Sequence, residues 1–439
     1  MIRRSGRTVP VLAPLTTLAL ALALSSCGKK QEPTTPPPTD DGATEAAAEE
    51  PAPEPEVKCN YIVLIDAGSS GTRAYTYEIE AAEDGGIPGL VERSNQKVEP
   101  GFSSYKAEPA KAGESLAGLL KAEGSVLETL PDECEAKTPT ALMATAGMRL
   151  LEAEEGGADA VKAIYQAAGE AISGAGLDLR FAGTISGQQE GLYAWLTANY
   201  ALGTLSGDKP TVGTLDLGGA STQIAFMPTE AGDAPTSTLT LGGKSFNVYA
   251  HSYLNYGLQQ AIQYVADRSC YPKGLNKGKG RYASCVKKLK PVVTPKKCET
   301  ASCGLATPGD TKNKLGVSQP PLPKDMQFYA IENYFYTHRL VKAAGGTPAA
   351  LAEAAGGPKG KTGFCGTKWA DITAANEGTP AKYLESACFA SAWVSVLLET
   401  YGFAKDAETI QWTEEIGETK ASWALGAALC SITGCLSAK

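Results

Sequence analysis

The sequence predicts an α/β protein of two lobes with a ligand site between them. Short apolar runs alternate with longer amphipathic stretches, the pattern of strands followed by helices. Two of the apolar runs end in similar loops, one starting at Asp66 and the other at Asp216. In addition, about 380 residues follow Val57, more than one hydrophobic core usually holds.

Residues 1–26 have the pattern of a bacterial lipoprotein signal peptide. A basic head precedes an apolar run, Val9 to Leu24, that is short for a membrane-spanning helix. The segment Leu24-Ser25-Ser26-Cys27 resembles a lipoprotein cleavage site, at which Cys27 becomes the acylated first residue. The alternative, an uncleaved transmembrane anchor, is disfavoured by the two prolines inside the run. Both interpretations predict an exported chain tethered to a membrane, and Gly28, in place of an Asp, favours the outer membrane or cell surface.

Residues 27–57 predict a disordered stalk. They are rich in Pro and Glu and carry too little apolar surface to fold. The whole chain has a formal net charge of −8, and the leader contributes only basic residues, so the exported part is more acidic still. Such a balance argues against nucleic acid as a partner.

The cysteines predict a disulfide framework. Of the eleven, Cys27 is assigned to lipidation, which leaves an even number in an exported chain. Proximity in sequence favours Cys59–Cys134, Cys270–Cys285, Cys298–Cys303, Cys365–Cys388 and Cys430–Cys435, but other pairings remain open. A zinc site built on the two Cys-x4-Cys spacings is the rival, disfavoured because the chain has only two histidines.

The first lobe is predicted over residues 58–176, completed by 421–439. A strand enters Asp66, and its expected successors are a strand at 73–77, a turn at 84–86, a helix at 109–130, a strand at 140–144 and a helix at 158–172. The second lobe is predicted over residues 177–420. It is expected to open with a strand at 179–185 and a helix through Tyr200, followed by disulfide-pinned loops at 270–325 and helices at 329–340 and 387–401.

The two Asp-containing loops predict a phosphate clamp. Residues without bulky side chains let the backbone approach an anion, and the hydroxyls of Ser69, Ser70 and Thr72 add donors. An Asp at the end of each strand can hold a metal-bound water without touching the phosphate that it would repel. One such loop is weak evidence, whereas two in the same arrangement indicate a ligand held between two lobes.

Five blocks, in order, resemble the nucleoside triphosphate diphosphohydrolases, or ecto-apyrases. They are 64–73, 144–149 (ATAGMR), 187–195 (GQQEGLYAW), 215–223 and, more loosely, 252–257. The resemblance runs from about Tyr61 to near the C-terminus. It implies the two-lobed actin-like, ribonuclease H-like fold, in which each lobe is a mixed sheet flanked by helices and the active site lies in the cleft between the lobes. The same resemblance implies a divalent cation (Mg²⁺ or Ca²⁺) and hydrolysis of nucleoside tri- and diphosphates. It also implies that the last helix, Trp423 to Cys435, packs back onto the first lobe.

The resemblance further assigns roles to individual residues. Glu190 is expected to be the catalytic base, with Ser221 and Gln223 positioning the attacking water. The phosphates would be bound by Ser69, Ser70, Gly71, Thr72, Gly218, Gly219 and Ala220, and the cation would be held through waters by Asp66, Asp216 and Thr145. Some relatives carry His where this chain has Gly71, so the preference between tri- and diphosphates stays open, as does the base preference.

Aromatic residues of the second lobe are candidates for stacking on a nucleobase, with core packing as the alternative. They are Tyr334, Phe335, Tyr336 and Trp393. The two histidines, His251 and His338, are expected to be structural, and the lysines at 287–297 to form a solvated face rather than a phosphate funnel. Two other functions remain open: an exopolyphosphatase-like phosphohydrolase, and a nucleotide-binding surface lipoprotein without catalysis.

Overall fold

The computed structural model describes residues 58–436 apart from 83–84, 233, 265–266, 296–304, 306–317 and 359–361. The described residues all belong to one compact unit, Glu56–Lys439. The predicted signal peptide, Cys27, the stalk and the pair Cys298–Cys303 lie outside them.

The first sheet has five strands in the order β3-β2-β1-β4-β5. They are β1 (Tyr61–Ala67), β2 (Thr72–Glu80), β3 (Gly89–Val98), β4 (Pro139–Ala144) and β5 (Asp178–Thr184). β1 is antiparallel to β2 and parallel to β4. Its side chains alternate between two cores, because successive residues of a strand point to opposite faces. Val63 and Ile65 face one core, and Ile62 and Leu64 face the other.

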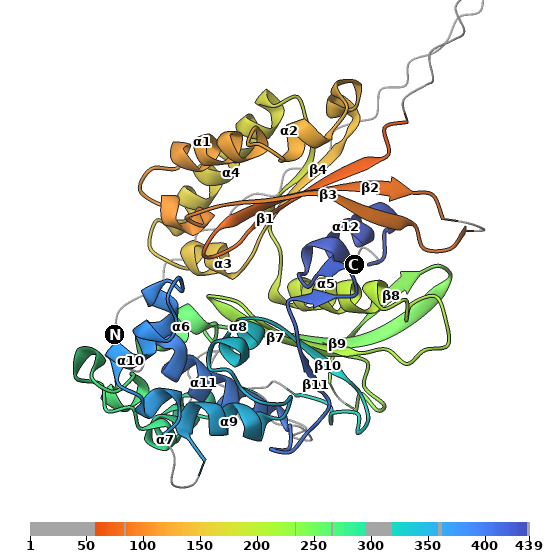
Figure 1. Cartoon of the computed structure of the whole chain (residues 1–439). Coiled ribbons are helices and arrows are strands. Elements are labelled where there is room, and N and C mark those ends of the chain that lie inside the picture. The colour runs from red at the N-terminus through yellow and green to blue at the C-terminus, as the bar shows by residue number, and fades with distance from the viewer. Residues whose placement is uncertain are drawn as a thin grey trace, which may run out of the picture. The chain divides into compact units, whose positions relative to one another are not determined.

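Helices α1 (Ala110–Leu120), α2 (Val126–Thr129), α3 (Ala146–Glu152) and α4 (Gly157–Gly174) accompany this sheet. Figure 1 shows α1 and α4 on one side of it, with α12 and α5 on the other. The single helix predicted at 109–130 is wrong, because the chain turns after Leu120 and Gly124 adopts a left-handed backbone with φ +67°. Two short 3₁₀ helices, Phe102–Tyr105 and Asp132–Lys137, complete the lobe.

Strand β5 belongs to the first sheet. The sequence predicted that a strand at 179–185 opens the second lobe, but β5 pairs in parallel with β4, from Pro139 opposite Asp178 to Ala144 opposite Thr184. Sheet membership depends on which distant strand lies alongside, and the local pattern does not carry that information. The chain therefore crosses to the second sheet only after β5.

The second sheet has six strands in the order β11-β10-β6-β7-β9-β8. They are β6 (Gly213–Leu217), β7 (Ser221–Phe226), β8 (Thr236–Leu241), β9 (Lys244–Leu254), β10 (Phe328–Glu332) and β11 (Ile410–Trp412). A small separate hairpin pairs β12 (Glu415–Ile416) with β13 (Thr419–Lys420). The helix predicted at 329–340 is wrong in its first part, since β10 pairs in parallel with β6 before the helix starts at Asn333.

Helices cover both faces of this sheet. On β7, Ile224 and Phe226 face a core shared with the long helix α11, whereas Ala225 faces a core shared with α5. The helices are α5 (Gly187–Ala201), α6 (Leu258–Tyr264), α7 (Tyr282–Val293), α8 (Asn333–Leu340), α9 (Pro348–Gly356), α10 (Trp369–Ala374) and α11 (Ala381–Tyr401). Three short 3₁₀ turns lie at Arg268–Cys270, Leu275–Lys277 and Phe364–Gly366.

The last helix, α12 (Ala424–Thr433), packs against α5 and β1, as the resemblance implied. The two helices approach so closely that a Cβ on Gly426 would lie 2.1 Å from the Tyr193 carbonyl oxygen. The Gly426 N–H donates to the Thr197 hydroxyl at 2.8 Å. The C-terminus therefore closes a layer of helices between the two sheets.

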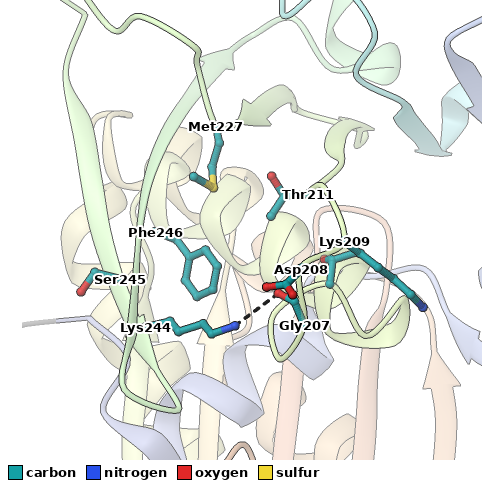
Figure 2. A pocket seen from close by; sticks show the side chains of 9 residues that line it. Gly207, Asp208, Lys209, Thr211, Met227, Lys244, Ser245 and Phe246 are labelled. Atoms are coloured by element: carbon teal, nitrogen blue, oxygen red, sulfur yellow. Dashed lines mark hydrogen bonds between the residues drawn. The ribbon is translucent and has the colours of Figure 1, made fainter.

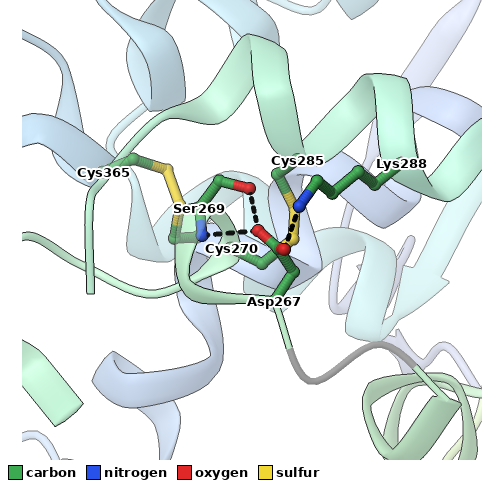
Figure 3. The surroundings of a disulfide bond; sticks show 7 residues. Asp267, Ser269, Cys270, Cys285, Lys288 and Cys365 are labelled. Carbon is green, nitrogen blue, oxygen red and sulfur yellow. Dashed lines mark hydrogen bonds and ion pairs between the residues drawn. A yellow bond between two sulfur atoms is a disulfide. The ribbon is translucent and has the colours of Figure 1, made fainter. Parts of the chain in front are cut away.

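Four of the five predicted disulfides are present: Cys59–Cys134, Cys270–Cys285, Cys365–Cys388 and Cys430–Cys435. Figure 3 shows the second of these, with the Asp267 carboxylate held by Ser269 and Lys288 beside it. Within the part of the chain that the structure describes, no helix is both long and apolar enough to cross a membrane.

We expect the disulfides to stabilise the fold unequally. Cys59–Cys134 spans 75 residues and Cys430–Cys435 spans 5. On the chain-entropy account, replacing both cysteines of the long-range pair by Ala should lower the free energy of unfolding by roughly 2 kcal/mol more than the same change at the short-range pair. Denaturant unfolding of both variants, with intact protein as reference, checks this. Equal losses would contradict the entropic account.

Candidate active site

The two Asp-containing loops meet face to face. The β1–β2 turn carries Ser69 and the β6–β7 turn carries Gly219, and a Cβ on Gly219 would lie 2.6 Å from the Ser69 hydroxyl oxygen. The carbonyls of Gly218 and Gly219 accept hydrogen bonds of 2.9 to 3.1 Å from the backbone N–H groups of residues 258–260 at the start of α6. The second loop is thereby fixed from behind, and its backbone is presented to the first.

A polar pocket of about 170 Å³ lies where the loops meet. Ser69, Gly147, Gly219 and Ala220 line it together with Gln259. The structure thus brings together phosphate-loop residues that the sequence assigned to two different lobes. Ser70 is exposed beside them, whereas Gly71 and Thr72 are buried.

Four carboxylates gather at the same place. The pKa of Asp66 is raised to about 7, mainly by burial; Arg73 opposes this rise, and the charges of Glu190 and Glu332 add to it. Burial also holds the pKa of Asp216 well above its usual range, together with the charges of Glu332, Glu190 and Asp66. A buried carboxylate among other carboxylates is costly to ionise without a cation nearby.

Sequence reasoning missed Glu332. It ends β10 opposite Leu217, and its neighbour Ile331 pairs with Asp216. Its backbone has φ +52°, an uncommon conformation for a residue other than glycine. The sequence predicted this position inside a helix, so nothing in the local pattern placed its carboxylate beside Asp216. An acidic residue directly after an apolar run was the only available signal.

The acidic cluster fits a divalent cation held through water. Oδ1 of Asp66 is buried and has no hydrogen-bond donor among the described residues, and its other oxygen lies 3.8 Å from Arg73. No three His, Cys, Asp or Glu side chains in the described ranges converge as a direct ligand set. Thr145 is buried at the start of α3, and its N–H donates to the Ala67 carbonyl at 3.3 Å, next to the end of β1. Asp66, Asp216 and Thr145 could hold waters around such an ion, an arrangement that suits Mg²⁺.

Glu190 lies in the first turn of α5. Ser186 caps this helix by accepting from the Gln189 N–H at 3.1 Å, and the Gln189 side chain accepts from the Ser186 N–H at 2.9 Å. This reciprocal cap fixes where the helix begins, and therefore where Glu190 points. Glu190 is buried, and its carboxylate accepts a hydrogen bond of 2.8 Å from Arg149.

Ser221 and Gln223 stand beside Glu190 on β7. The Gln223 amide donates to the Ser221 hydroxyl at 2.7 Å and to the Ser252 hydroxyl at 3.0 Å. Both residues are 1% exposed. A Cβ on Gly187 would lie 2.4 Å from Ser252, so the start of α5 can approach β9 only because this position is glycine. This close approach keeps the Glu190 carboxylate near the Ser221 hydroxyl and the Gln223 amide, and hydrogen bonds connect the three groups through Arg149.

Two of the four candidate nucleobase residues are core residues. Tyr334 is fully buried and hydrogen-bonds Thr222. Trp393 is 1% exposed and stacks on Tyr256. Neither ring offers a face to a ligand, so core packing accounts for both. Phe335 is half-buried and Tyr336 is exposed, and a nucleobase contact for these two stays a prediction.

The histidines and lysines take no part in this cluster. His251 is partly buried, which lowers its pKa to about 4, and His338 stacks on Trp412. Lys288 and Lys290 are ion-paired with Asp267 and Glu399, and Lys287 is exposed. Lys296 and Lys297 lie outside the described residues. These placements agree with structural histidines and a solvated lysine face.

A larger hollow of about 480 Å³ lies elsewhere, between the loop after α5 and the β8–β9 hairpin. Figure 2 shows Phe246 and Met227 on its apolar wall and Lys244 at its edge. The Lys244 ammonium donates to the Ser206 and Gly207 carbonyls at 2.9 and 3.2 Å. None of the residues assigned to the phosphate loops or to the acidic cluster lines this hollow.

Two sheets flanked by helices, with facing phosphate-type loops and an acidic cluster, define a nucleotide phosphohydrolase architecture. The chain belongs to the GDA1/CD39 (nucleoside phosphatase) family, whose profile matches residues 54–274 and 263–436. The family expected from the five sequence blocks is therefore confirmed.

Several relatives resemble the chain over most of its length. Probable apyrase 3 of Arabidopsis thaliana is 31% identical over 416 residues, covering 85% of this chain and 83% of the relative. Human ectonucleoside triphosphate diphosphohydrolase 8 is 30% identical over 426 residues, covering 86% and 83%. A solved nucleoside triphosphate hydrolase from Neospora caninum has a TM-score of 0.57 at 16% identity and covers 84% of this chain and 92% of that chain. The last likeness supports the actin-like fold alone.

The acidic cluster makes a prediction about stability. Without divalent cations, Asp66→Asn should raise the melting temperature at pH 8, because the folded protein no longer ionises a buried carboxylate. Folding raises the pKa of Asp66 from 3.8 to about 7, so the penalty grows as pH rises between these values. The stabilisation should therefore shrink toward pH 5. Thermal scans in EDTA check this, with the exposed Asp208→Asn as control. A pH-independent effect, or a lower melting temperature at pH 8, would count against the buried charge.

Proposed function

We propose that the protein hydrolyses the terminal phosphates of nucleoside tri- and diphosphates outside the cytoplasm. The observation that carries the proposal is one buried cluster, in which Glu190, Ser221 and Gln223 lie beside two facing phosphate-type loops. The matched relatives, an apyrase and an ectonucleoside triphosphate diphosphohydrolase, support this class of substrate.

Glu190 acts as the base in this proposal. Its carboxylate accepts a proton from a water while the water oxygen attacks the terminal phosphorus. The bond from that phosphorus to the bridging oxygen breaks, and the shortened nucleotide leaves with the electron pair. Ser221 and Gln223 orient the water, and their mutual hydrogen bond of 2.7 Å holds them for that task. Phosphoryl transfer depends mainly on such positioning and on charge stabilisation.

The phosphates lie between the backbones of residues 69–72 and 218–220. Asp66, Asp216 and Thr145 would hold a divalent cation, Mg²⁺ or Ca²⁺, through water molecules. When bound, the cation neutralises phosphate charge and relieves the repulsion within the acidic cluster. The unpartnered Asp66 oxygen and the raised pKa of Asp66 and Asp216 support this assignment.

A phosphate-release assay tests the substrate class. ATP, ADP, UDP, polyphosphate and pyrophosphate are compared with Mg²⁺, with Ca²⁺ and with EDTA. We expect release from the nucleotides, dependent on the cation. Release from polyphosphate alone would favour the exopolyphosphatase-like alternative. Nucleotide binding without release from any substrate would favour a non-catalytic surface lipoprotein.

Two substitutions separate the base from the cation site. Glu190→Gln keeps the size of the side chain but cannot accept the proton of the water, so the rate of hydrolysis should fall by about 10²–10⁴. Nucleotide affinity should persist, because the phosphate loops are untouched. Asp216→Asn should instead lower the rate and shift the cation dependence together. Steady-state kinetics with cation titrations, and nucleotide binding by calorimetry, distinguish the two. Glu190→Gln turning over ATP at the wild-type rate would refute the mechanism.

The proposed location rests on the N-terminal sequence and the disulfides. The pairs found in the described residues support an oxidising compartment. The segment ending at Cys27 supports a lipid anchor at the outer membrane or cell surface. Cys27→Ala should abolish acyl labelling in cells and leave an unprocessed precursor, as detected by metabolic labelling and mass spectrometry. A chain with Ser25→Ala, which keeps the cysteine, serves as control. Undiminished labelling of the Cys27 variant would reject the anchor.

A further inference from the structure

Arg149 connects the two lobes at the proposed base. It lies on α3, in the first lobe, but its guanidinium binds groups beyond that lobe's sheet. Nη1 donates to the Ile185 carbonyl at 2.8 Å, and Nη2 donates to Glu190 Oε2 at 2.8 Å and approaches the Ser221 hydroxyl at 3.4 Å. The guanidinium of Arg149 therefore contacts three elements: the loop before α5, the first turn of α5 and the start of β7.

We propose that Arg149 is a positioning residue that holds the Glu190 carboxylate in its working orientation and ties that orientation to the phosphate loop of the first lobe. This inference rests on the proposed function. With Oε2 bound by Arg149, the carboxylate is held so that Oε1 takes the proton of the water. A planar guanidinium with several fixed donors suits this task better than the point charge of a lysine.

The tie to the phosphate loop runs through α3 itself. Gly147 lies two residues before Arg149 in this short helix, and a Cβ on Gly147 would lie 2.9 Å from Ser69 Cα. One end of α3 therefore abuts the first phosphate loop, while Arg149 holds the base. Movement of that loop relative to the second lobe would pull the carboxylate with it. Correct closure of the loops and correct placement of the base are coupled.

The ion pair is well shielded from solvent. The side chains of Arg149 and Glu190 are 16% and 9% exposed. An ion pair on the surface contributes little to stability. In a shielded pair such as this one, loss of one partner leaves the other charge buried and unpaired. A positioning role predicts that kcat falls while nucleotide binding persists. If Arg149 only supported the fold, its loss should lower stability without reducing kcat selectively over nucleotide binding.

The test compares Arg149→Ala and Arg149→Lys with Arg93→Ala, a control at an exposed ion pair with Glu78 on the outer strands. Arg149→Ala should lower kcat by about 10–100-fold, as expected for a slightly misplaced reacting group. KM, and Kd for a non-hydrolysable ATP analogue, should stay within about threefold. Arg149→Lys should recover part of the loss, and Arg93→Ala should match wild type. Melting temperatures verify that each variant is folded, and Arg149→Lys carries the test if the alanine variant is not.

The double variant with Glu190→Gln identifies the residue through which Arg149 acts. If it acts through Glu190, adding Arg149→Ala to Glu190→Gln should lower kcat by less than about threefold, because coupled residues are non-additive. A full multiplicative loss, an equal rise in KM, or a wild-type kcat in Arg149→Ala would each overturn the inference while leaving the proposed hydrolase intact. A wild-type rate in Glu190→Gln alone would overturn the proposed function first, and with it the base that Arg149 positions.

Discussion

The closeness of the two phosphate loops is the constraint on which the site depends. A Cβ on Gly101 would lie 2.3 Å from the Gly68 carbonyl oxygen, and one on Gly257 would lie 2.3 Å from the Ala220 nitrogen. The segments that carry Gly101 and Gly257 therefore lie in close contact with the two loops, and a side chain at either glycine would displace the loop backbone. Because the two loops come from different sheets, the site exists only when both lobes are folded and in contact.

The buried carboxylates of the acidic cluster repel one another, and in the absence of a cation this repulsion disfavours their burial together. Asp66 and Asp216 are each 5% exposed and lie within reach of the charges of Glu190 and Glu332. The positive charges of Arg73, 3.8 Å away, and of Lys97 oppose this repulsion at Asp66. A protein optimised for stability alone would not bury these groups together. If a cation binds at this cluster as proposed, its binding would offset part of the cost of burying these carboxylates.

The sequence predicted the parts of the site that are local and failed where distant segments meet. The loops after Asp66 and Asp216 follow buried strands and contain small residues, so the type of loop was visible in the chain itself, while phosphate binding stays a prediction. Glu190 was singled out because its block, 187–195, resembles the family, and its role as the base stays a prediction. Glu332 was missed, β5 was assigned to the wrong lobe, and Tyr334 and Trp393 were taken as possible ligand contacts. In each case the outcome depends on which remote strand or helix lies alongside, and the local pattern does not encode that.

The helical layer between the sheets explains how one short helix can influence catalysis. On its far side α5 is packed against α12, where Gly426 touches the Tyr193 backbone, and on its near side against β7 and β9. The helix α5 is thus packed on two sides, while α3 in the first lobe carries both the contact to Ser69 and the guanidinium of Arg149. With the proposed role of Arg149, phosphate binding at the first loop would act on Glu190 through α3.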